Sequence, residues 1–255
     1  MQPSGQRVRT ALPSAPASTF VALAVALAVL VAVSTSSASV SIGRSGAVAV
    51  QPAQVLVILF ADHAARSAPD AAAPVLQIVR ARRPITGART VLPVLGRRSP
   101  DGVRWLRVRL PGRPNGGTGW IERRATRIAH TRWHLVVDTS ERRVTVYRQG
   151  RPVRACRAVV GKPATPTPHG RFFVEDVVQL RARDVGGPFA LALSARSNVL
   201  QEFAGGPGQV ALHGRTNVGG VLGSAVSSGC VRLADDAMRW LVIRIAPGVP
   251  VTIKR

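Results

Sequence analysis

Short segments in which apolar and polar side chains alternate, each bounded by proline, glycine or asparagine, recur through much of this 255-residue chain. The clearest example is 104–110, RWLRVRL, which is followed at once by the turn-forming run 111–117, PGRPNGG. A two-residue period places neighbouring side chains on opposite faces of an extended strand, and proline and glycine clusters end each strand. Residues 74–128 are therefore expected to form a small antiparallel β unit.

The same pattern continues toward the C-terminus, where residues 132–255 indicate a second, larger β domain. One helix is expected there, because Asp235 and Asp236 precede apolar residues spaced by three and four, and Pro247-Gly248 ends the pattern. A short helical turn is also expected at 198–203. The predicted fold class is mainly β with one C-terminal helix, and the predicted strands are 134–138, 143–148, 152–160, 171–179, 189–193, 209–212 and 249–253.

Residues 212–233, LHGRTNVGGVLGSAVSSGCVRL, hold the groups that acyl transfer through a thiol requires. Cys230 offers a nucleophile, and His213, 17 positions earlier, offers a base. A free thiol is only a few per cent ionised near neutral pH, so a neighbouring base is needed to form the thiolate. Gly229 permits a tight turn before the cysteine, and Arg232 adds a fixed cation. The order of histidine and cysteine is opposite to that of papain-like proteases.

These residues resemble the active-site signature of the YkuD-type L,D-transpeptidases: a His-Gly pair, a glycine-rich loop and Ser-x-Gly-Cys-(Ile/Val)-Arg. A second block, 160–172 (VGKPATPTPHGRF), resembles the Thr-Pro-Thr-Pro turn of the same family. The resemblance runs from about residue 134 to residue 254, and it implies a YkuD-like β-sandwich for 132–255. One position departs from the pattern: Ser228 stands where the family usually has a second histidine, so no titratable ring is present there.

The resemblance implies a role for each residue of the signature. Cys230 would attack the peptide bond between the L-centre of a diamino acid and the terminal D-Ala of a tetrapeptide stem, and His213 would be its base. The thioester would then pass to the side-chain amine of a second stem, giving a 3→3 cross-link in peptidoglycan. This chemistry requires no metal and no other cofactor. The remaining implied roles are orientation or oxyanion binding by Gly214, Ser227, Ser228 and Gly229, and substrate binding by Arg232.

Three alternatives to the transpeptidase function stay open. If water replaces the amine, the enzyme is an L,D-carboxypeptidase. A sortase-like transpeptidase also uses cysteine, histidine and arginine, but sortases separate the histidine and the cysteine by far more than 17 residues. The third alternative is a catalytically silent peptidoglycan-binding wall protein, because residues 105–121 (WLRVRLPGRP…TGWI) resemble the bacterial SH3-like modules that accompany cell-wall enzymes.

The N-terminus predicts export. Arg7 and Arg9 precede an uninterrupted apolar run, 20–33, and small residues follow it, which is the pattern of a secretory signal peptide. The run is shorter than the roughly 20 residues that a membrane-spanning helix needs, and an uncleaved membrane anchor is the alternative. We therefore expect 1–38 to be a signal peptide or anchor, 39–73 to be an uncertain linker, and the protein to be extracytoplasmic or at the cell wall.

The formal net charge of +23 comes almost wholly from arginine, since Lys162 and Lys254 are the only lysines. Such a chain attracts polyanions, and for an exported protein these are the anionic cell wall or the membrane surface. Nucleic acid is not expected as a partner, because the arginines are scattered and no nucleic-acid-binding motif occurs. We expect a monomer in which Cys156 is a small buried side chain and both Cys156 and Cys230 are reduced.

Overall fold

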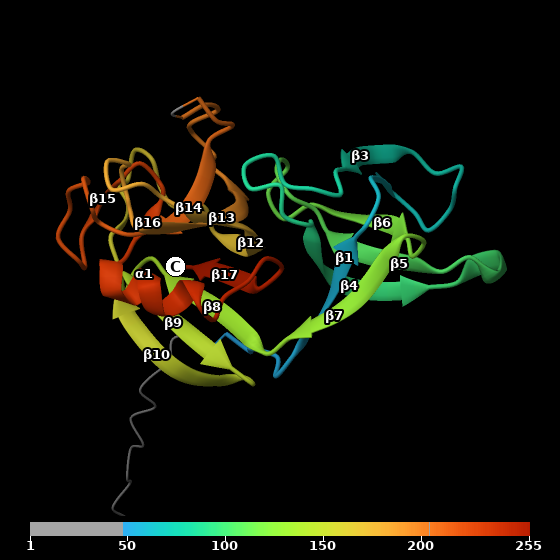
Figure 1. The fold of residues 1–255 in the computed structure, drawn as a ribbon, viewed down its shortest axis with the longest axis horizontal. Coiled ribbons are helices and arrows are strands. Elements are labelled where there is room, and N and C mark those ends of the chain that lie inside the picture. Colours follow the sequence, from blue (N-terminus) through green and yellow to red (C-terminus); the bar gives the residue numbers. More distant parts are fainter. Residues whose placement is uncertain (1–47, 204) are drawn as a thin grey trace, which may run out of the picture. The chain divides into compact units, whose positions relative to one another are not determined.

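The computed structural model describes residues 48–203 and 205–255, which contain a seven-stranded sheet, an eight-stranded sheet, a two-stranded sheet and one α-helix (Figure 1). The seven-stranded sheet belongs to the N-terminal module, residues 48–131. Its strand order is β3-β2-β6-β5-β4-β1-β7, and all its pairings are antiparallel, as the alternation predicts. The elements are β1 (Gln54–Leu59), β2 (His63–Arg66), β3 (Val75–Val79), β4 (Val91–Arg98), the 3-10 turn η1 (Pro100–Gly102), β5 (Trp105–Arg109), β6 (Thr118–Glu122) and β7 (Thr126–Thr131).

This sheet begins earlier in the chain than the expected boundary at residue 74. The apolar run 55–61, VLVILFA, contributes most of β1, which pairs with β4 on one side and with β7 on the other. Val57 and Leu59 are fully buried, so the run is an internal strand and not part of a linker. An internal strand that is covered on both faces lacks the alternation of a half-exposed strand. The SH3-like resemblance of 74–128 stays a prediction.

The C-terminal domain, residues 132–255, contains the eight-stranded sheet, in the order β10-β9-β8-β17-β12-β13-β14-β16. Two of its pairings are parallel, β8 with β17 and β14 with β16, and the short strands β11 and β15 pair separately. The strands are β8 (Trp133–Asp138), β9 (Arg143–Arg148), β10 (Arg151–Arg157), β11 (Val160–Gly161), β12 (Gly170–Gln179), β13 (Phe189–Arg196), β14 (Gln209–His213), β15 (Ala225–Ser227), β16 (Val231–Arg232) and β17 (Pro250–Lys254).

Strand β12 connects two halves of this sheet that share one core. Its residues 170–173 pair with β17, and residues 174–179 pair mainly with β13. Side chains from both halves, such as Leu135 of β8 and Leu212 of β14, belong to the same buried cluster. Two layers that enclose one core are the arrangement of a β-sandwich. The mainly β fold and the sandwich that the sequence predicts for this domain are thereby confirmed.

The same strand also takes part in the core of the N-terminal module. Phe172 packs in the core of the C-terminal domain, whereas Phe173 packs in the N-terminal core with residues such as Val57 and Leu92. Neighbouring side chains of a strand point to opposite faces, so one strand supplies a large aromatic ring to each core. Strand β12 is therefore the main structural link between the two cores.

The single helix among the described residues, α1 (Asp235–Val242), begins where the sequence predicts and buries Ala237, Met238 and Leu241. It ends at Val242, earlier than the predicted stop at Pro247, and turn hydrogen bonds carry the chain on to Ile245. The helical turn expected at 198–203 is wrong. The carbonyls of Ser197 and Leu200 accept hydrogen bonds from Arg113 instead of from a following helical turn.

The predicted signal peptide or anchor, residues 1–38, lies outside the described residues. Among residues 48–203 and 205–255, no helix is long and apolar enough to cross a membrane.

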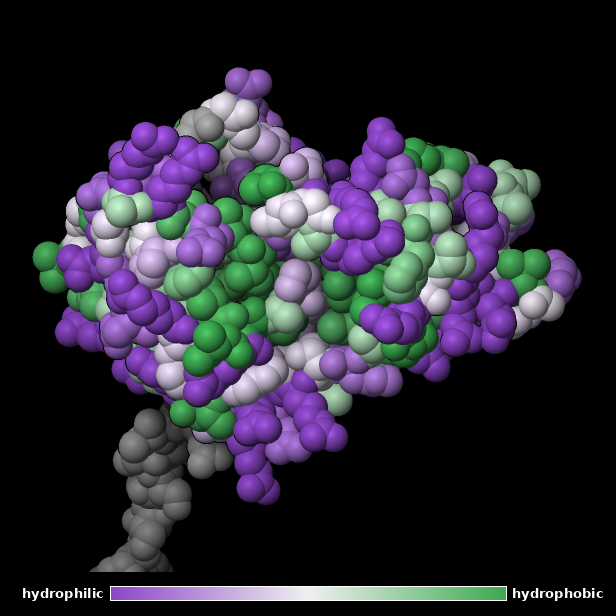
Figure 2. Space-filling model, viewed as in Figure 1, coloured by the Kyte–Doolittle hydropathy of each residue, from purple (hydrophilic) through white to green (hydrophobic). Residues whose placement is uncertain are grey.

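Hydrophilic side chains cover much of the face seen in Figure 2, and hydrophobic side chains gather between them over both sheets. Several arginines of the protein stack on aromatic rings. Arg154 and Arg244, for example, lie over Trp240, with 4.9 and 4.2 Å from the guanidinium carbon to the ring centroid. Such stacking uses the long side chain for packing as well as for charge. The polyanionic partner inferred from the net charge stays a prediction.

Candidate active site

The parallel neighbours β14 and β16 bring together the histidine and the cysteine of the sequence signature. Leu212 is opposite Val231, and His213 is opposite Arg232. Because side chains alternate along each strand, Leu212 and Val231 enter the buried core, whereas His213, Cys230 and Arg232 are only partly covered on the other face. The alternation of two short strands therefore decides which side chains reach the surface.

That face borders a pocket of about 120 Å³. His213, Ser228, Cys230 and Arg232 all line it, so four of the seven predicted site residues meet at one cavity. A concave pocket with a few convergent polar groups is the usual form of a small-ligand site. The other lining residues are largely apolar: Val185, Ser197, Leu200, Phe203, Gly208, Gln209, Val210 and Val218.

The ring of His213 is fixed by its neighbour and by a distant glycine. Its Nδ1 lies 2.8 Å from the carbonyl oxygen of Gly214, and since a carbonyl can only accept, Nδ1 carries the proton in this contact. The other ring nitrogen, Nε2, is then left as the basic atom. Gly186 packs against the ring, and any side chain at that position would collide with it. Gly186 lies far from the signature in sequence, so no local sequence pattern predicts its contact with the ring.

Asp235, expected only to begin the helix, also holds the chain that follows His213. Its carboxylate accepts the amide of Arg215 at 2.6 Å and the hydroxyl of Thr216 at 2.5 Å. Burial would raise the pKa of Asp235, but the hydrogen bonds from Thr216 and Arg215 outweigh it and lower the pKa below the usual value. An ionised carboxylate therefore fixes the turn beyond Gly214, a contact that sequence reasoning missed.

Ser227, Gly229 and Cys230 belong to one tight turn between β15 and β16. Ser227 is fully buried, and its hydroxyl donates to the carbonyl of Cys230 at 2.6 Å and accepts the amide of Gly229 at 3.2 Å. Gly229 has a φ of +115°, a conformation that other residues rarely adopt. The serine and the glycine thus shape the backbone that presents Cys230 to the pocket.

The Thr-Pro-Thr-Pro block packs against this turn. The carbonyl of Ser227 accepts the amide of Lys162 at 2.9 Å and the hydroxyl of Thr165 at 3.3 Å. The hydroxyl of Thr167 accepts the amide of Gly161 at 2.9 Å. Gly161 runs so close to the backbone of residues 165–167 that no side chain would fit there. The two sequence blocks of the family pattern are therefore physically one unit, with 160–172 bracing the cysteine turn.

Arg232 connects the pocket to the glycine-rich loop that separates His213 from the cysteine turn. Its Nη1 donates to the carbonyl of Gly219 at 2.7 Å, and its main chain pairs with Val159. The Nε of Arg232 is buried and has no hydrogen-bond partner among the described residues. The guanidinium therefore stabilises the glycine-rich loop.

Burial sets the protonation of the two central groups. It raises the pKa of the Cys230 thiol, although the amide of Ala211 and the charge of Arg232 oppose the rise. It lowers the pKa of His213, an effect that the Gly214 carbonyl opposes and Arg232 reinforces. At neutral pH the pair is therefore a neutral thiol beside a neutral imidazole, and the imidazole is available as a base.

The two cysteines of the chain are both free in the structure. Cys156 is half-buried on β10, packed against the core, and not fully buried as expected. Within the described residues no group of three or more histidine, cysteine, aspartate or glutamate side chains is placed to hold a metal ion.

Comparison with known proteins shows what the domain that carries this pocket is similar to. Residues 132–253 match the family model of the YkuD L,D-transpeptidase catalytic domain. The resemblance to this family is confirmed. We refer to residues 132–255 from here on as the L,D-transpeptidase domain.

The relatives are distant. The YkuD protein of Bacillus subtilis (strain 168) is 29% identical over 123 residues, a match that covers 48% of this chain and 66% of the relative's length. L,D-transpeptidase 1 of Mycobacterium tuberculosis (strain ATCC 25618 / H37Rv) is 26% identical, covering 63% of this chain and 74% of that protein. Among solved structures, the L,D-transpeptidase LdtMt1 in complex with imipenem aligns with a TM-score of 0.40 and 21% identity, covering 66% of this chain and 92% of that one.

Proposed function

We propose that this protein is a peptidoglycan L,D-transpeptidase that uses Cys230 as its nucleophile and forms 3→3 cross-links between stem peptides. The observation that carries the proposal is that His213, at the end of β14, and Cys230, directly before β16, line one pocket in a domain that matches the L,D-transpeptidase family. A thiol and a base that share a pocket form the minimal unit of nucleophilic acyl transfer.

In the first half-reaction, Nε2 of His213 takes the proton of the thiol as sulfur attacks the donor carbonyl. That carbonyl belongs to the L-centre of the diamino acid in a tetrapeptide stem. The C–N bond to the terminal D-Ala then breaks, and the imidazolium returns its proton to the departing amine. The products are free D-Ala and a thioester on Cys230. The hydrogen bond from Nδ1 to Gly214 keeps the ring in the tautomer that this step needs.

The negative charge that develops on the carbonyl oxygen requires donors on the cysteine turn. The amide of Gly229 already donates to Ser227, so the amides of Ser228 and Cys230 are the remaining candidates on this turn. Ser228 lines the pocket. In this scheme Ser227 acts indirectly, because its hydroxyl fixes the carbonyl of Cys230 and thereby the direction of the neighbouring amides.

In the second half-reaction, the side-chain amine of an acceptor stem attacks the thioester. His213 accepts a proton from the amine, sulfur leaves, and the new amide is the 3→3 cross-link. If water attacks instead, the product is a shortened stem and the enzyme acts as an L,D-carboxypeptidase. The pocket is apolar along one side, with Leu200, Phe203 and Val210, which disfavours water relative to a bound acceptor.

The substrate places the activity outside the cytoplasm, in keeping with the signal-like pattern of residues 1–38. The proposal also gives Arg232, which lines the pocket, the role of binding an acidic group of the stem. The net charge of +23 would hold the protein near the anionic wall or membrane surface, and the association would weaken as salt increases.

Imipenem tests the proposal directly, because opening of its β-lactam ring by a nucleophile leaves an acyl group and no leaving group that can diffuse away. We expect intact-protein mass spectrometry to show the addition of one imipenem and peptide mapping to place it on Cys230. Cys156→Ala is the matched control and should retain the adduct, whereas Cys230→Ala should lose it. An adduct that persists in Cys230→Ala would refute the assignment of the nucleophile.

A catalytically silent wall-binding protein is the alternative function. It predicts binding to isolated peptidoglycan with no imipenem adduct and no release of D-Ala. The two functions are therefore separated by the same mass measurement.

A further inference from the structure

One wall of the pocket is built from a segment without regular secondary structure. This pocket-wall segment, residues 197–203 and 205–208, connects β13 to β14. Ser197, Leu200, Phe203 and Gly208 all line the pocket that contains Cys230. Neither a helix nor a sheet ladder fixes most of this wall, so its position depends on individual hydrogen bonds.

Backbone hydrogen bonds close the segment at its two ends and again within it. The amide of Ser197 donates to the carbonyl of Gly208 at 2.8 Å, and the amides of Phe203 and Gly206 pair with each other's carbonyls at 2.9 and 3.0 Å. Gly208 has a φ of +63° and approaches the carbonyl of Leu200 so closely that no side chain would fit. The closure leaves the carbonyls of Ser197, Leu200 and Pro207 available to an outside donor.

Arg113 of the N-terminal module supplies that donor. Its guanidinium reaches three carbonyl oxygens: Nη1 donates to Pro207 at 2.9 Å, and Nη2 donates to Ser197 at 2.8 Å and to Leu200 at 3.1 Å. The planar fork of an arginine suits this task, because it can bind several acceptors in one plane. One side chain therefore ties both ends and the middle of the segment together.

Asn115, two residues further along the same turn, fixes the start of the segment. Its Nδ2 donates to the carbonyl of Arg196 at 2.7 Å and to Oδ1 of Asn198 at 3.0 Å. Its own Oδ1 accepts the amide of Arg196 at 2.8 Å. The asparagine thus pairs with the last residue of β13 as a neighbouring strand would, and uses its side chain in place of a backbone.

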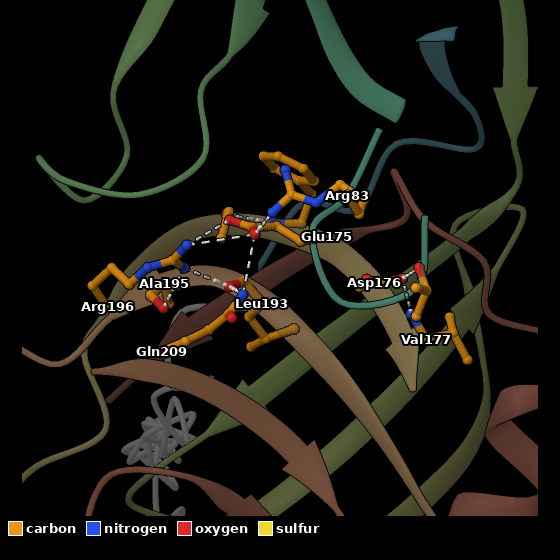
Figure 3. Close-up of polar contacts among 11 residues, drawn as sticks. Arg83, Glu175, Asp176, Val177, Leu193, Ala195, Arg196 and Gln209 are labelled. Carbon is orange, nitrogen blue, oxygen red and sulfur yellow. Dashed lines mark hydrogen bonds and ion pairs between the residues drawn. The ribbon is translucent and has the colours of Figure 1, made fainter. Parts of the chain in front are cut away.

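A buried ion cluster connects the N-terminal module to both strands that flank the segment (Figure 3). Glu175 of β12 is buried, and its carboxylate pairs with Arg83 of the N-terminal module and with Arg196 of β13. The distance from Oε1 of Glu175 to Nη2 of Arg196 is 3.2 Å. Gln209, the first residue of β14, donates to the same carboxylate at 3.1 Å. The ends of the pocket-wall segment are thereby anchored to the N-terminal module from a second side.

We propose that Arg113 and Asn115 are positioning residues that hold the pocket-wall segment in the conformation that receives the stem peptide, so that the N-terminal module completes the substrate-binding pocket of the L,D-transpeptidase domain. The proposal rests on the proposed function for the identity of the ligand. Neither residue touches the reacting atoms. Their loss should therefore weaken binding far more than it changes the chemistry at Cys230.

The double variant Arg113→Ala/Asn115→Ala tests the proposal in the full chain. Hydrogen exchange should become at least tenfold faster at the amides of Ser197, Phe203, Gly206 and Gly208, with no change in the β13 core. With imipenem as the probe, the concentration that gives half the maximal acylation rate should rise about tenfold, while the rate at saturation changes less than threefold. Arg104→Ala is the matched control: it removes the same charge from an exposed site of the same module that makes no contact with the segment, and it should leave both measurements unchanged.

Each other outcome overturns the proposal. Unchanged exchange in the double variant would show that the segment holds its shape alone, and faster exchange with unchanged half-saturation would show that its position does not matter for binding. Should the double variant be too unstable to purify, Asn115→Ala alone removes three of the hydrogen bonds, and unchanged exchange there would have the same meaning. If the wild-type protein forms no imipenem adduct, the proposed function fails, while the exchange measurement still decides whether Arg113 and Asn115 hold the segment.

Discussion

The two β regions of this protein are both built from short alternating strands but contribute to the site in different ways. The L,D-transpeptidase domain carries His213 at the end of β14 and Cys230 directly before β16, and the alternation of these short strands separates core from pocket. The N-terminal module carries none of the signature residues, yet its Arg83, Arg113 and Asn115 contact the segments that surround the pocket. Motif residues of the L,D-transpeptidase domain therefore indicate the chemistry, whereas the geometry of the pocket also depends on residues of the N-terminal module that belong to no motif.

The largest effect is expected for Cys230→Ala, which removes the proposed chemistry and should leave the fold of the L,D-transpeptidase domain intact. We expect loss of all measurable transpeptidation and imipenem acylation, because the proposed nucleophile is gone, with little change in the melting temperature, because the side chain is small and borders the pocket. Assays of D-Ala release and thermal unfolding check both halves. Val231→Ala is the matched control on the core face: it should lower stability by about 1–3 kcal/mol and leave the chemistry of the folded protein in place.

Glu175→Gln tests the junction between the regions. We expect a loss of about 3 kcal/mol in the free energy of unfolding, because the change leaves the buried guanidinium of Arg196 without its ion pair. Urea unfolding measures the loss. Asp236→Asn is the control, because Asp236 is 76% exposed and pairs with Arg154 at 3.5 Å, so its loss should cost less than about 1 kcal/mol.

Burial raises the pKa of Glu175, while Arg196 and Arg83 lower it. A Glu175→Gln variant as stable as the wild type at neutral pH would show that burial dominates and that the carboxyl is already neutral. The junction would then be held by hydrogen bonds and by Phe173, and not by charge.

Acid should destabilise the L,D-transpeptidase domain through His134 of β8. Burial, with a smaller effect of Arg171, lowers the pKa of His134 from 6.5 to about 4. The unfolded chain binds a proton at this residue more readily than the native chain, so the contribution to stability is present above about pH 6.5 and is lost as the pH falls toward 4. Melting temperatures between pH 7.5 and 4.5 should fall less steeply in His134→Gln than in the wild type. His130→Gln, at an exposed histidine of the N-terminal module, controls for the loss of a ring, and equal slopes in wild type and His134→Gln would contradict the prediction.

The smallest effect is expected for Ser228→His, which restores the residue usual in the family. Ser228 lines the pocket, and the acylation rate should change by less than about tenfold, equivalent to about 1.4 kcal/mol in the barrier. In the wild type, acylation should rise with pH as a single group of the coupled histidine–cysteine pair loses its proton. Ser227→His is the contrasting variant, because Ser227 is fully buried and should not tolerate a ring. A rate loss of more than tenfold in Ser228→His would show that the serine makes a required contact.

Much of the fold could be predicted from the local sequence pattern. Alternation predicts seven of the ten strands of the L,D-transpeptidase domain, and the acidic start of α1 marks its first residue. The short strands β11, β15 and β16 were missed, because two or three residues are too few to show a period. Two further features could not be predicted. The strand β1 has no alternation because it is internal, and the segment after β13 resembles a helical turn but is held open by Arg113, more than 80 residues earlier in the chain.

The same limit applies to the site. Spacing and residue type identify His213, Cys230 and the turn between Ser227 and Cys230, because these groups are close in sequence. Gly186 and Asp235 act on the ring and on the chain after it through contacts that only the folded sheet creates. Non-local contacts of this kind leave no periodic or motif-like trace, so a single sequence does not reveal them.

The most direct test of the account is to incubate the purified protein with a tetrapeptide stem and to follow the products by mass spectrometry. We expect one D-Ala to be released for each 3→3 dimer formed, with the thioester on Cys230 detectable on rapid quenching, and neither product in Cys230→Ala. Release of D-Ala without dimer would assign the protein as a carboxypeptidase. Dimer formation by Cys230→Ala at the wild-type rate would contradict the central claim that this cysteine carries the acyl group.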